Sequence, residues 1–137
     1  MEKICWKEEY SVGVEVLDNQ HRRLLELVNQ IWEHRDNDEA DDVLGQMVRY
    51  AKEYFSEEEK LMRQYGYAGL GAQEKQHAYF IDTTAELAVG MLNDKQATMG
   101  EIAEFLKLWW TTHILREDMK YKEFFKTRMP VKSALSI

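Results

Sequence analysis

Apolar residues recur at spacings of three and four along most of the chain, which is the repeat of one face of an α-helix. Polar or glycine-rich stretches interrupt this repeat. Four helices are therefore predicted, over residues 18–37, 39–65, 72–93 and 98–125. Helices of this length with short connections are typical of an up-down-up-down four-helix bundle.

Residues at the predicted helix ends support these boundaries. Asp18 precedes the first periodic run and is expected to be its N-cap. Thr98 and Glu101 have the spacing of a capping box at the start of the fourth helix. Pro130, the only proline, is expected to end that helix, because proline cannot donate the backbone hydrogen bond that a helix needs.

Residues 1–17 follow a different pattern, in which apolar residues alternate with polar ones as in a strand. The sequence offers no partner strand, and a lone strand is not stable. We therefore expect an extended arm that lies across the bundle and is anchored by Trp6 and Tyr10. The predicted fold class is all-α, an up-down-up-down four-helix bundle with an extended N-terminal arm, as one domain over residues 1–137.

The composition narrows the choice of partner and compartment. The chain has 137 residues, of which 45% are hydrophobic, and this suits one globular domain with a core. A formal net charge of -7 argues against nucleic acid and against an anionic membrane as partner. No apolar run approaches the ~18–20 residues that cross a bilayer. The single cysteine, Cys5, allows no internal disulfide, so we expect a cytoplasmic protein.

Each predicted helix carries polar side chains on its apolar face. They are His21 in the first helix, Tyr54 and Glu58 in the second, Gln73 and His77 in the third, and His113 in the fourth. Imidazole nitrogens and carboxylate oxygens bind iron, zinc and manganese, and bundles build such sites from inward-facing side chains. The pattern predicts one metal pocket inside the bundle, with Glu57 and Glu59 pointing elsewhere.

Each of these residues, taken alone, has a simpler interpretation. A histidine on an apolar face is often an ordinary core residue, and Tyr54 could be a core aromatic with its hydroxyl bonded. Glu58 could pair with Arg49 or Arg116, because an unpaired carboxylate in a core is costly. Gln73 could bond the free N–H groups at a helix start. Three histidines on the core faces of three different helices favour the metal pocket over these separate explanations.

Several stretches together resemble the hemerythrin family, in particular its single-domain bacterial members. They are Trp6 to Val14, Leu17 to His21, Tyr54 to Met62, Gly66-Tyr67, His77 with Phe80, and Trp109 to Asp118. The resemblance covers nearly the whole chain. It implies a four-helix bundle around a non-heme di-iron site that reversibly binds O2.

The resemblance also implies roles for single residues. His21 is similar to a histidine that binds one iron, and His77 and His113 are similar to histidines that bind the other. Glu58 and Asp118 are similar to the two carboxylates that bridge the irons. Periodicity alone does not place Asp118 in the pocket, because it follows His113 by five residues, about 140° around an ideal helix.

Two positions depart from the family pattern. Tyr54 and Gln73 stand where the family has histidine, so each iron loses one imidazole. A phenolate ligand from Tyr54 would favour ferric iron, because an anionic hard oxygen stabilises the higher charge. Gln73 would bind weakly through its carbonyl oxygen or leave its place to water. Both residues are predicted to belong to the metal site with the other five.

The predicted function is binding or sensing of O2 at non-heme iron, with two irons per chain of the Fe–O–Fe type. We expect a binding protein rather than an enzyme, with O2 or a related small oxidant as ligand, and a monomer or weak homo-oligomer as assembly. The two substitutions leave alternatives. One is a variant iron site that reacts with peroxide or nitric oxide. The other is a degenerate bundle with one metal, zinc or no metal, used as an interaction or signalling module.

Overall fold

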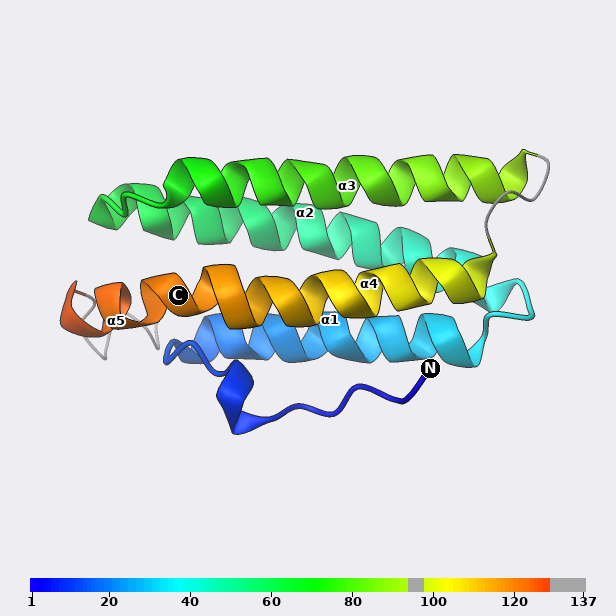
Figure 1. The fold of residues 1–137 in the computed structure, drawn as a ribbon, viewed down its shortest axis with the longest axis horizontal. Coiled ribbons are helices and arrows are strands. Elements are labelled where there is room, and N and C mark those ends of the chain that lie inside the picture. Colours follow the sequence, from blue (N-terminus) through cyan, green and yellow to red (C-terminus); the bar gives the residue numbers. More distant parts are fainter. Residues whose placement is uncertain (94–97, 129–137) are drawn as a thin grey trace.

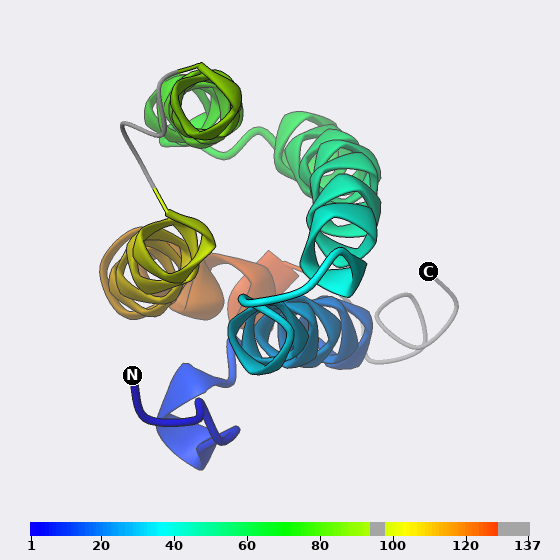
Figure 2. The same cartoon turned by 90° about the vertical axis from the view of Figure 1, so that its right-hand side faces the viewer.

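The structure, a computed structural model, describes residues 1–93 and 98–128. Its α-helices are α1 (Glu15–Glu33), α2 (Glu39–Tyr65), α3 (Leu70–Leu92), α4 (Met99–His113) and α5 (Met119–Arg128). Helices α1 to α4 run alternately up and down, and α5 continues the direction of α4 (Figure 1). Seen end-on, α1, α2, α3 and α4 surround a common centre in that order (Figure 2). The predicted all-α four-helix bundle is therefore confirmed. No helix in the described part of the chain has the length and apolar character needed to cross a membrane.

The first helix begins earlier than predicted. The sequence predicts a helix over 18–37 with an N-cap at Asp18, whereas α1 spans Glu15–Glu33. Asp18 is a buried residue of its first turn, and its carboxylate accepts hydrogen bonds from Val12 N at 2.8 Å and Ser11 Oγ at 2.6 Å. The prediction of Asp18 as N-cap is wrong, because this carboxylate ties the arm to the helix instead of capping the helix backbone.

The arm before α1 lies along the outside of the bundle, as predicted, but it is not extended throughout, because Glu8–Tyr10 form a short 3-10 helix, η1 (Figure 1). Asn29 of α1 exchanges two hydrogen bonds with Ile4, donating to its carbonyl oxygen and accepting from its N–H, both at 2.8 Å. Tyr10 is buried, and its ring lies 5.7 Å from that of Trp6. The guanidinium of Arg22 covers the Trp6 ring at 4.5 Å. These contacts fix the arm on α1.

The predicted range of the second helix, 39–65, agrees with α2. The third helix, predicted over 72–93, differs from α3 only at its ends. At the start of the fourth, Thr98 Oγ1 accepts a hydrogen bond from Glu101 N at 3.1 Å, as the capping box predicts. Pro130, expected to end that helix, lies outside the described residues.

The predicted fourth helix, over 98–125, is interrupted by a π-helical turn at Ile114–Asp118. In a π-turn each hydrogen bond spans five residues rather than four, so the turn takes in one extra residue. Residues five apart then take up positions that residues four apart have in an α-helix. The turn therefore brings Asp118 to the side of the helix that carries His113, which a regular helix would not do.

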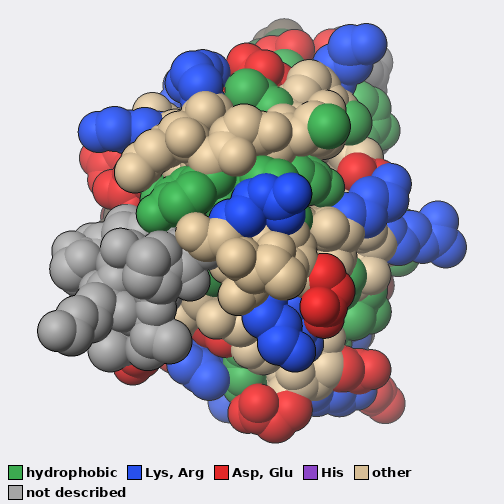
Figure 3. Space-filling view, turned by 90° about the vertical axis from the view of Figure 1, so that its left-hand side faces the viewer, with side chains coloured by type: hydrophobic (Ala, Val, Ile, Leu, Met, Phe, Trp, Pro, Cys, Tyr) green, Lys and Arg blue, Asp and Glu red, His purple; other side chains and the backbone are tan. Residues whose placement is uncertain are grey.

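Two hydrophobic clusters lie on either side of the predicted pocket along the bundle. The larger one includes Leu24, Tyr54 and Trp110, and the smaller one includes Leu17, Leu61 and Tyr121. Figure 3 shows the end of the molecule near the smaller cluster, where hydrophobic side chains form a band among charged ones. No histidine is visible in the described part of this face. The two clusters therefore close the polar layer between them.

Helix α3 has an unusually polar core face. Its buried residues are Gln73, His77, Phe80 and Thr84, and only Phe80 among them is hydrophobic. Ile81, Leu87, Ala88 and Met91 add half-buried apolar contacts with the larger cluster. Helix α3 therefore contributes fewer fully buried hydrophobic side chains to the core than α1, α2 or α4 does.

Candidate metal centre

The predicted site residues meet in one layer across the bundle. His21 comes from α1, Tyr54 and Glu58 from α2, Gln73 and His77 from α3, His113 from α4, and Asp118 from the π-turn. None of these side chains belongs to a residue that is more than 3% exposed. The structure therefore brings all seven residues together, and their role in binding metal stays a prediction.

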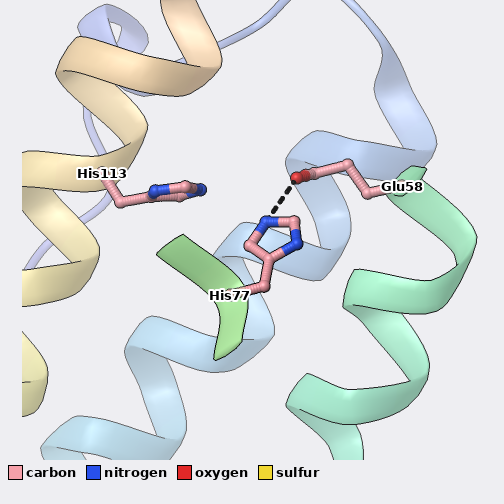
Figure 4. A group of neighbouring side chains, drawn as sticks. All are labelled: Glu58, His77 and His113. Carbon is pink, nitrogen blue, oxygen red and sulfur yellow. Dashed lines mark ion pairs between the residues drawn. The ribbon is translucent and has the colours of Figure 1, made fainter. Parts of the chain in front are cut away.

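The first group of potential ligands consists of Glu58, His77 and His113. Each offers one ligand atom, and these atoms lie within 4.8 Å of one another. Glu58 Oε1 is 3.2 Å from His77 Nε2. Figure 4 shows the three side chains reaching inward from α2, α3 and α4 toward a common space.

The second group consists of His21, Glu58 and Asp118, again with ligand atoms within 4.8 Å of one another. His21 Nε2 lies 3.0 Å from Asp118 Oδ2 and 3.7 Å from Glu58 Oε2. The other oxygen of Asp118, Oδ1, lies 3.0 Å from His113 Nε2. Each carboxylate therefore faces histidines of both groups.

The atoms that point into this layer lack hydrogen-bond partners. Among residues 1–93 and 98–128, no partner exists for the buried atoms His21 Nε2, His77 Nε2, His113 Nε2, Glu58 Oε1, Gln73 Oε1 and Asp118 Oδ2. More than ~90% of buried polar groups in proteins are paired, and each unpaired one costs about 1–3 kcal/mol. Such a concentration of open nitrogen and oxygen atoms fits a bound transition-metal ion, which would satisfy them together.

Two of the histidines are hydrogen-bonded through Nδ1, the outer nitrogen, which faces away from the layer. His77 Nδ1 lies 2.7 Å from Glu59 Oε2, and His113 Nδ1 lies 2.7 Å from Gln76 Oε1. Because an oxygen can only accept here, each Nδ1 is the donor and carries the proton. In the neutral ring this leaves the Nε2 lone pair facing the pocket, which is the arrangement of metal-binding histidines.

The two substituted positions contact the carboxylates of the layer. The Tyr54 hydroxyl donates to Glu58 Oε2 at 2.7 Å. The Tyr121 hydroxyl, from α5, donates to the same oxygen at 3.0 Å. Gln73 Nε2 donates to Asp118 Oδ1 at 3.0 Å. Both substituted side chains therefore point into the layer.

Two of the simpler interpretations of these residues are wrong. The partners of Glu58 are histidines and tyrosines rather than Arg49 or Arg116. Gln73 donates to a carboxylate rather than accepting from the N–H groups of a helix start. The simpler interpretation of Tyr54, a core aromatic with a bonded hydroxyl, agrees with its contacts.

Sequence reasoning missed Glu59, Gln76 and Tyr121. The prediction that Glu59 points elsewhere is wrong, because its carboxylate reaches the outer nitrogen of His77. Glu59 and Gln76 directly follow or precede a predicted ligand, so their place in the sequence was the available signal. Tyr121 follows Asp118 by three residues, a helical spacing that places it near the layer.

Protons and negative charges balance each other in this layer. Burial alone would lower the pKa of His21, but the adjacent carboxylates of Asp118 and Glu58 outweigh burial and raise the pKa to about 9. Burial would raise the pKa of Asp118, yet the nearby charge of His113 holds it far below its usual range. Burial also raises the pKa of Tyr54 well above its usual range, and the Glu58 charge adds to this. The Asp118 carboxylate therefore remains ionised.

Fold and site together define a four-helix-bundle protein with a buried layer of imidazole and carboxylate groups. The family model described as Hemerythrin HHE cation binding domain matches residues 12–125. The chain therefore belongs to the hemerythrin family, a non-heme iron, O2-binding type of protein, and the resemblance seen in the sequence motifs is confirmed.

Individual proteins agree with this assignment. A bacteriohemerythrin of Clostridium acetobutylicum is 30% identical over 124 residues, which cover 85% of this chain and 96% of that protein. A bacteriohemerythrin of Pseudomonas aeruginosa (strain LESB58) is 28% identical over 132 residues, covering 94% of this chain and 86% of that protein. A solved structure of wild-type hemerythrin shares the fold with a TM-score of 0.81 at 22% identity, covering 89% of this chain and 97% of that chain.

Proposed function

We propose that this chain binds O2 at two non-heme iron ions of the Fe–O–Fe type held between its four helices. The observation that carries the proposal is the pair of ligand groups that share one glutamate and meet at a second carboxylate. Family membership supports iron and O2 over the peroxide, nitric oxide and metal-free alternatives. The number of ions and their bridging are part of the proposal.

Five residues are the proposed ligands. His77 and His113 would hold one ion and His21 the other, each through Nε2. Glu58 and Asp118 would bridge, because each of these carboxylates faces histidines of both groups. Their two negative charges would offset the charge of the ions inside the core.

Tyr54 and Gln73 complete the proposed metal pocket. Gln73 has a buried Oε1 with no hydrogen-bond partner in the described ranges, so it is available to an ion or to a water molecule. Tyr54 lies beside His21, with ring centroids 5.2 Å apart, and its hydroxyl contacts Glu58 in the half of the pocket that contains His21.

The surroundings of the pocket suit a small apolar ligand. When bound, ferrous iron supplies the electrons and the open coordination position that O2 requires. The chain supplies apolar surroundings, because the fully buried Trp110 ring lies 6.5 Å from that of His21. Aromatic stacking of His77 on Phe55, with centroids 3.9 Å apart, fixes the ring orientation. A hydrophobic shell of this kind controls solvent access to a metal site.

The compartment and the assembly that the sequence predicts are kept here as proposals. We propose the cytoplasm, because the one cysteine, Cys5, is exposed and free, as suits a reducing compartment. A monomer or weak homo-oligomer is the proposed assembly.

Iron analysis and O2 titration of the full chain test this function. Protein from iron-rich medium, never exposed to chelator, is expected to contain close to two irons and to change its absorption spectrum reversibly between argon and O2. His113→Ala is expected to lose iron, whereas His34→Ala, at the surface beside Glu39, is the matched control and should retain it. One ion, no ion or an irreversible spectral change would contradict the proposal.

A further inference from the structure

The two carboxylate oxygens of Glu58 have different surroundings. An ionised carboxylate has about four lone-pair sites, two on each oxygen. Oε2 accepts hydrogen bonds from Tyr54 at 2.7 Å and from Tyr121 at 3.0 Å, which occupy both of its sites. Oε1 has no hydrogen-bond partner among the residues that the structure describes. One oxygen is therefore occupied by protein donors and the other is free.

The occupied and the free oxygen face opposite halves of the centre. Oε2 lies 3.7 Å from His21 Nε2, and Oε1 lies 3.2 Å from His77 Nε2. The half around His77 and His113 thus offers two imidazoles and a free carboxylate oxygen. The half around His21 offers one imidazole and the free Oδ2 of Asp118.

We propose that Tyr54 and Tyr121 make the two halves unequal by holding Glu58 Oε2 with two hydrogen bonds. An ion binds first and more tightly between His77 and His113, and a second ion binds more weakly beside His21. Tyr54 is then a positioning residue that acts through Glu58. The inference rests on the proposed two-iron function and describes the order in which that centre fills.

Packing keeps both phenols in place. Tyr54 is 2% exposed, and its ring meets those of Phe55 and Trp110 edge-on at 5.9 and 6.1 Å. Tyr121 is fully buried, with its ring 5.0 Å from that of Phe125. A hydroxyl that left Glu58 would become a buried donor without a partner, which is unfavourable. The hydrogen bonds to Oε2 therefore persist while the second ion competes for that oxygen.

A direct bond from Tyr54 to iron, as the sequence predicts, has the opposite consequence. If Tyr54 is a ligand, removing its hydroxyl weakens metal binding in the His21 half. If Tyr54 acts through Glu58, removing the hydroxyl frees a lone pair of Oε2 and strengthens binding there. The two roles are therefore distinguished by the sign of one measured change.

Graded removal of iron from the loaded full chain tests the inference. Iron remaining per chain is measured by elemental analysis after equilibration with increasing EDTA. We expect two steps: the ion beside His21 leaves first, and removal of the ion between His77 and His113 requires about tenfold or more EDTA, in line with the 10–100-fold effects of groups that orient metal ligands. In the variant with both Tyr54→Phe and Tyr121→Phe, the first ion is expected to leave at an EDTA concentration about tenfold higher, so that the first step approaches the second.

Matched variants separate this effect from a general change in stability. Tyr50→Phe removes a hydroxyl one helical turn earlier on α2, at a half-buried position, and should leave both steps unchanged. Tyr54→Phe alone, which leaves the Tyr121 hydrogen bond in place, should shift the first step by a smaller amount.

Several outcomes would overturn the inference. Loss of both ions in one step in the unmodified chain would do so. A phenolate-to-iron absorption band that disappears in Tyr54→Phe would also overturn it, if that variant loses iron at a lower EDTA concentration than the unmodified chain. Either result leaves the two-iron function standing, whereas a chain that takes up no iron contradicts that function and the inference with it.

Discussion

His77 and His113 present the same nitrogen to the pocket, but different groups hold their outer nitrogens. The Nδ1 of His77 is bound by the carboxylate of Glu59, and that of His113 by the neutral amide of Gln76. A carboxylate on the outer nitrogen raises the basicity of a ligand imidazole. His77 should therefore be the stronger electron donor of the two toward a metal ion.

Glu59→Ala is expected to weaken iron binding about 10- to 100-fold, because His77 loses the partner that fixes its tautomer and orientation. Glu59→Gln keeps an acceptor without the charge and should have a smaller effect. Competition with a coloured chelator measures the affinity. Glu57→Ala is the control, because Glu57 is exposed and accepts a hydrogen bond from half-buried Gln20 at 2.6 Å rather than from a histidine of the layer. Equal effects of Glu57→Ala and Glu59→Ala would refute the prediction.

At the scale of elements, the π-turn Ile114–Asp118 decides where the second carboxylate lies. It also sets the orientation of α5, whose residues Tyr121 and Phe125 are buried. A π-turn can be regarded as an α-helix with one inserted residue. Removing one residue should restore an α-helix with the same downstream faces, whereas adding one should rotate those faces by about 100°.

We therefore expect opposite results from deleting and inserting one residue. Deletion of Leu115, which is 41% exposed, should keep Asp118 on the face of His113 and retain iron. Insertion of an alanine after Leu115 should move Asp118 out of the layer and expose Phe125, with loss of iron and about 3 kcal/mol or more of stability. Iron content and thermal melting measure both effects. Equal loss of iron in the two variants would contradict this account of the turn.

The sequence predicted those features that follow from regular helical spacing. The predicted inward position of His21, Glu58 and His77 agrees with their burial, because each falls on the apolar face of a regular helix. Asp118 was out of reach of periodicity, because a π-turn leaves no clear pattern of apolar residues. The prediction of Asp18 as a cap is wrong because the side-chain contacts of the arm cannot be inferred from spacing. Tyr121 was missed because its hydrogen bond to Glu58 joins residues far apart in sequence.

At the scale of the molecule, the polar layer joins all four helices of the bundle between two hydrophobic clusters. Its open nitrogen and oxygen atoms would remain unpaired without a cation. Because a metal ion of this kind binds the folded chain and only weakly the unfolded one, metal binding adds directly to the free energy of unfolding.

Removal of iron by chelation is expected to lower the melting temperature by about 10 °C or more. At a free metal concentration of 1,000 times Kd, binding adds about 4 kcal/mol, and each kcal/mol shifts the melting of a domain this size by roughly 3 °C. Calorimetry with and without EDTA measures the shift, and added iron should restore the original transition. An unchanged transition would indicate that iron does not hold the bundle together.

The polar core face of α3 has a consequence for the protein in a living cell. Of the fully buried side chains of α3, only Phe80 is hydrophobic, and Ile81, Leu87 and Met91 are half-buried, so bound iron adds to a small hydrophobic contact in fastening this helix. In a chain without iron, α3 opens more often, and opened segments are the ones that proteases cleave. Iron supply should then set the lifetime of the protein as well as its capacity for O2, and iron-starved cells should degrade the chains that they cannot load.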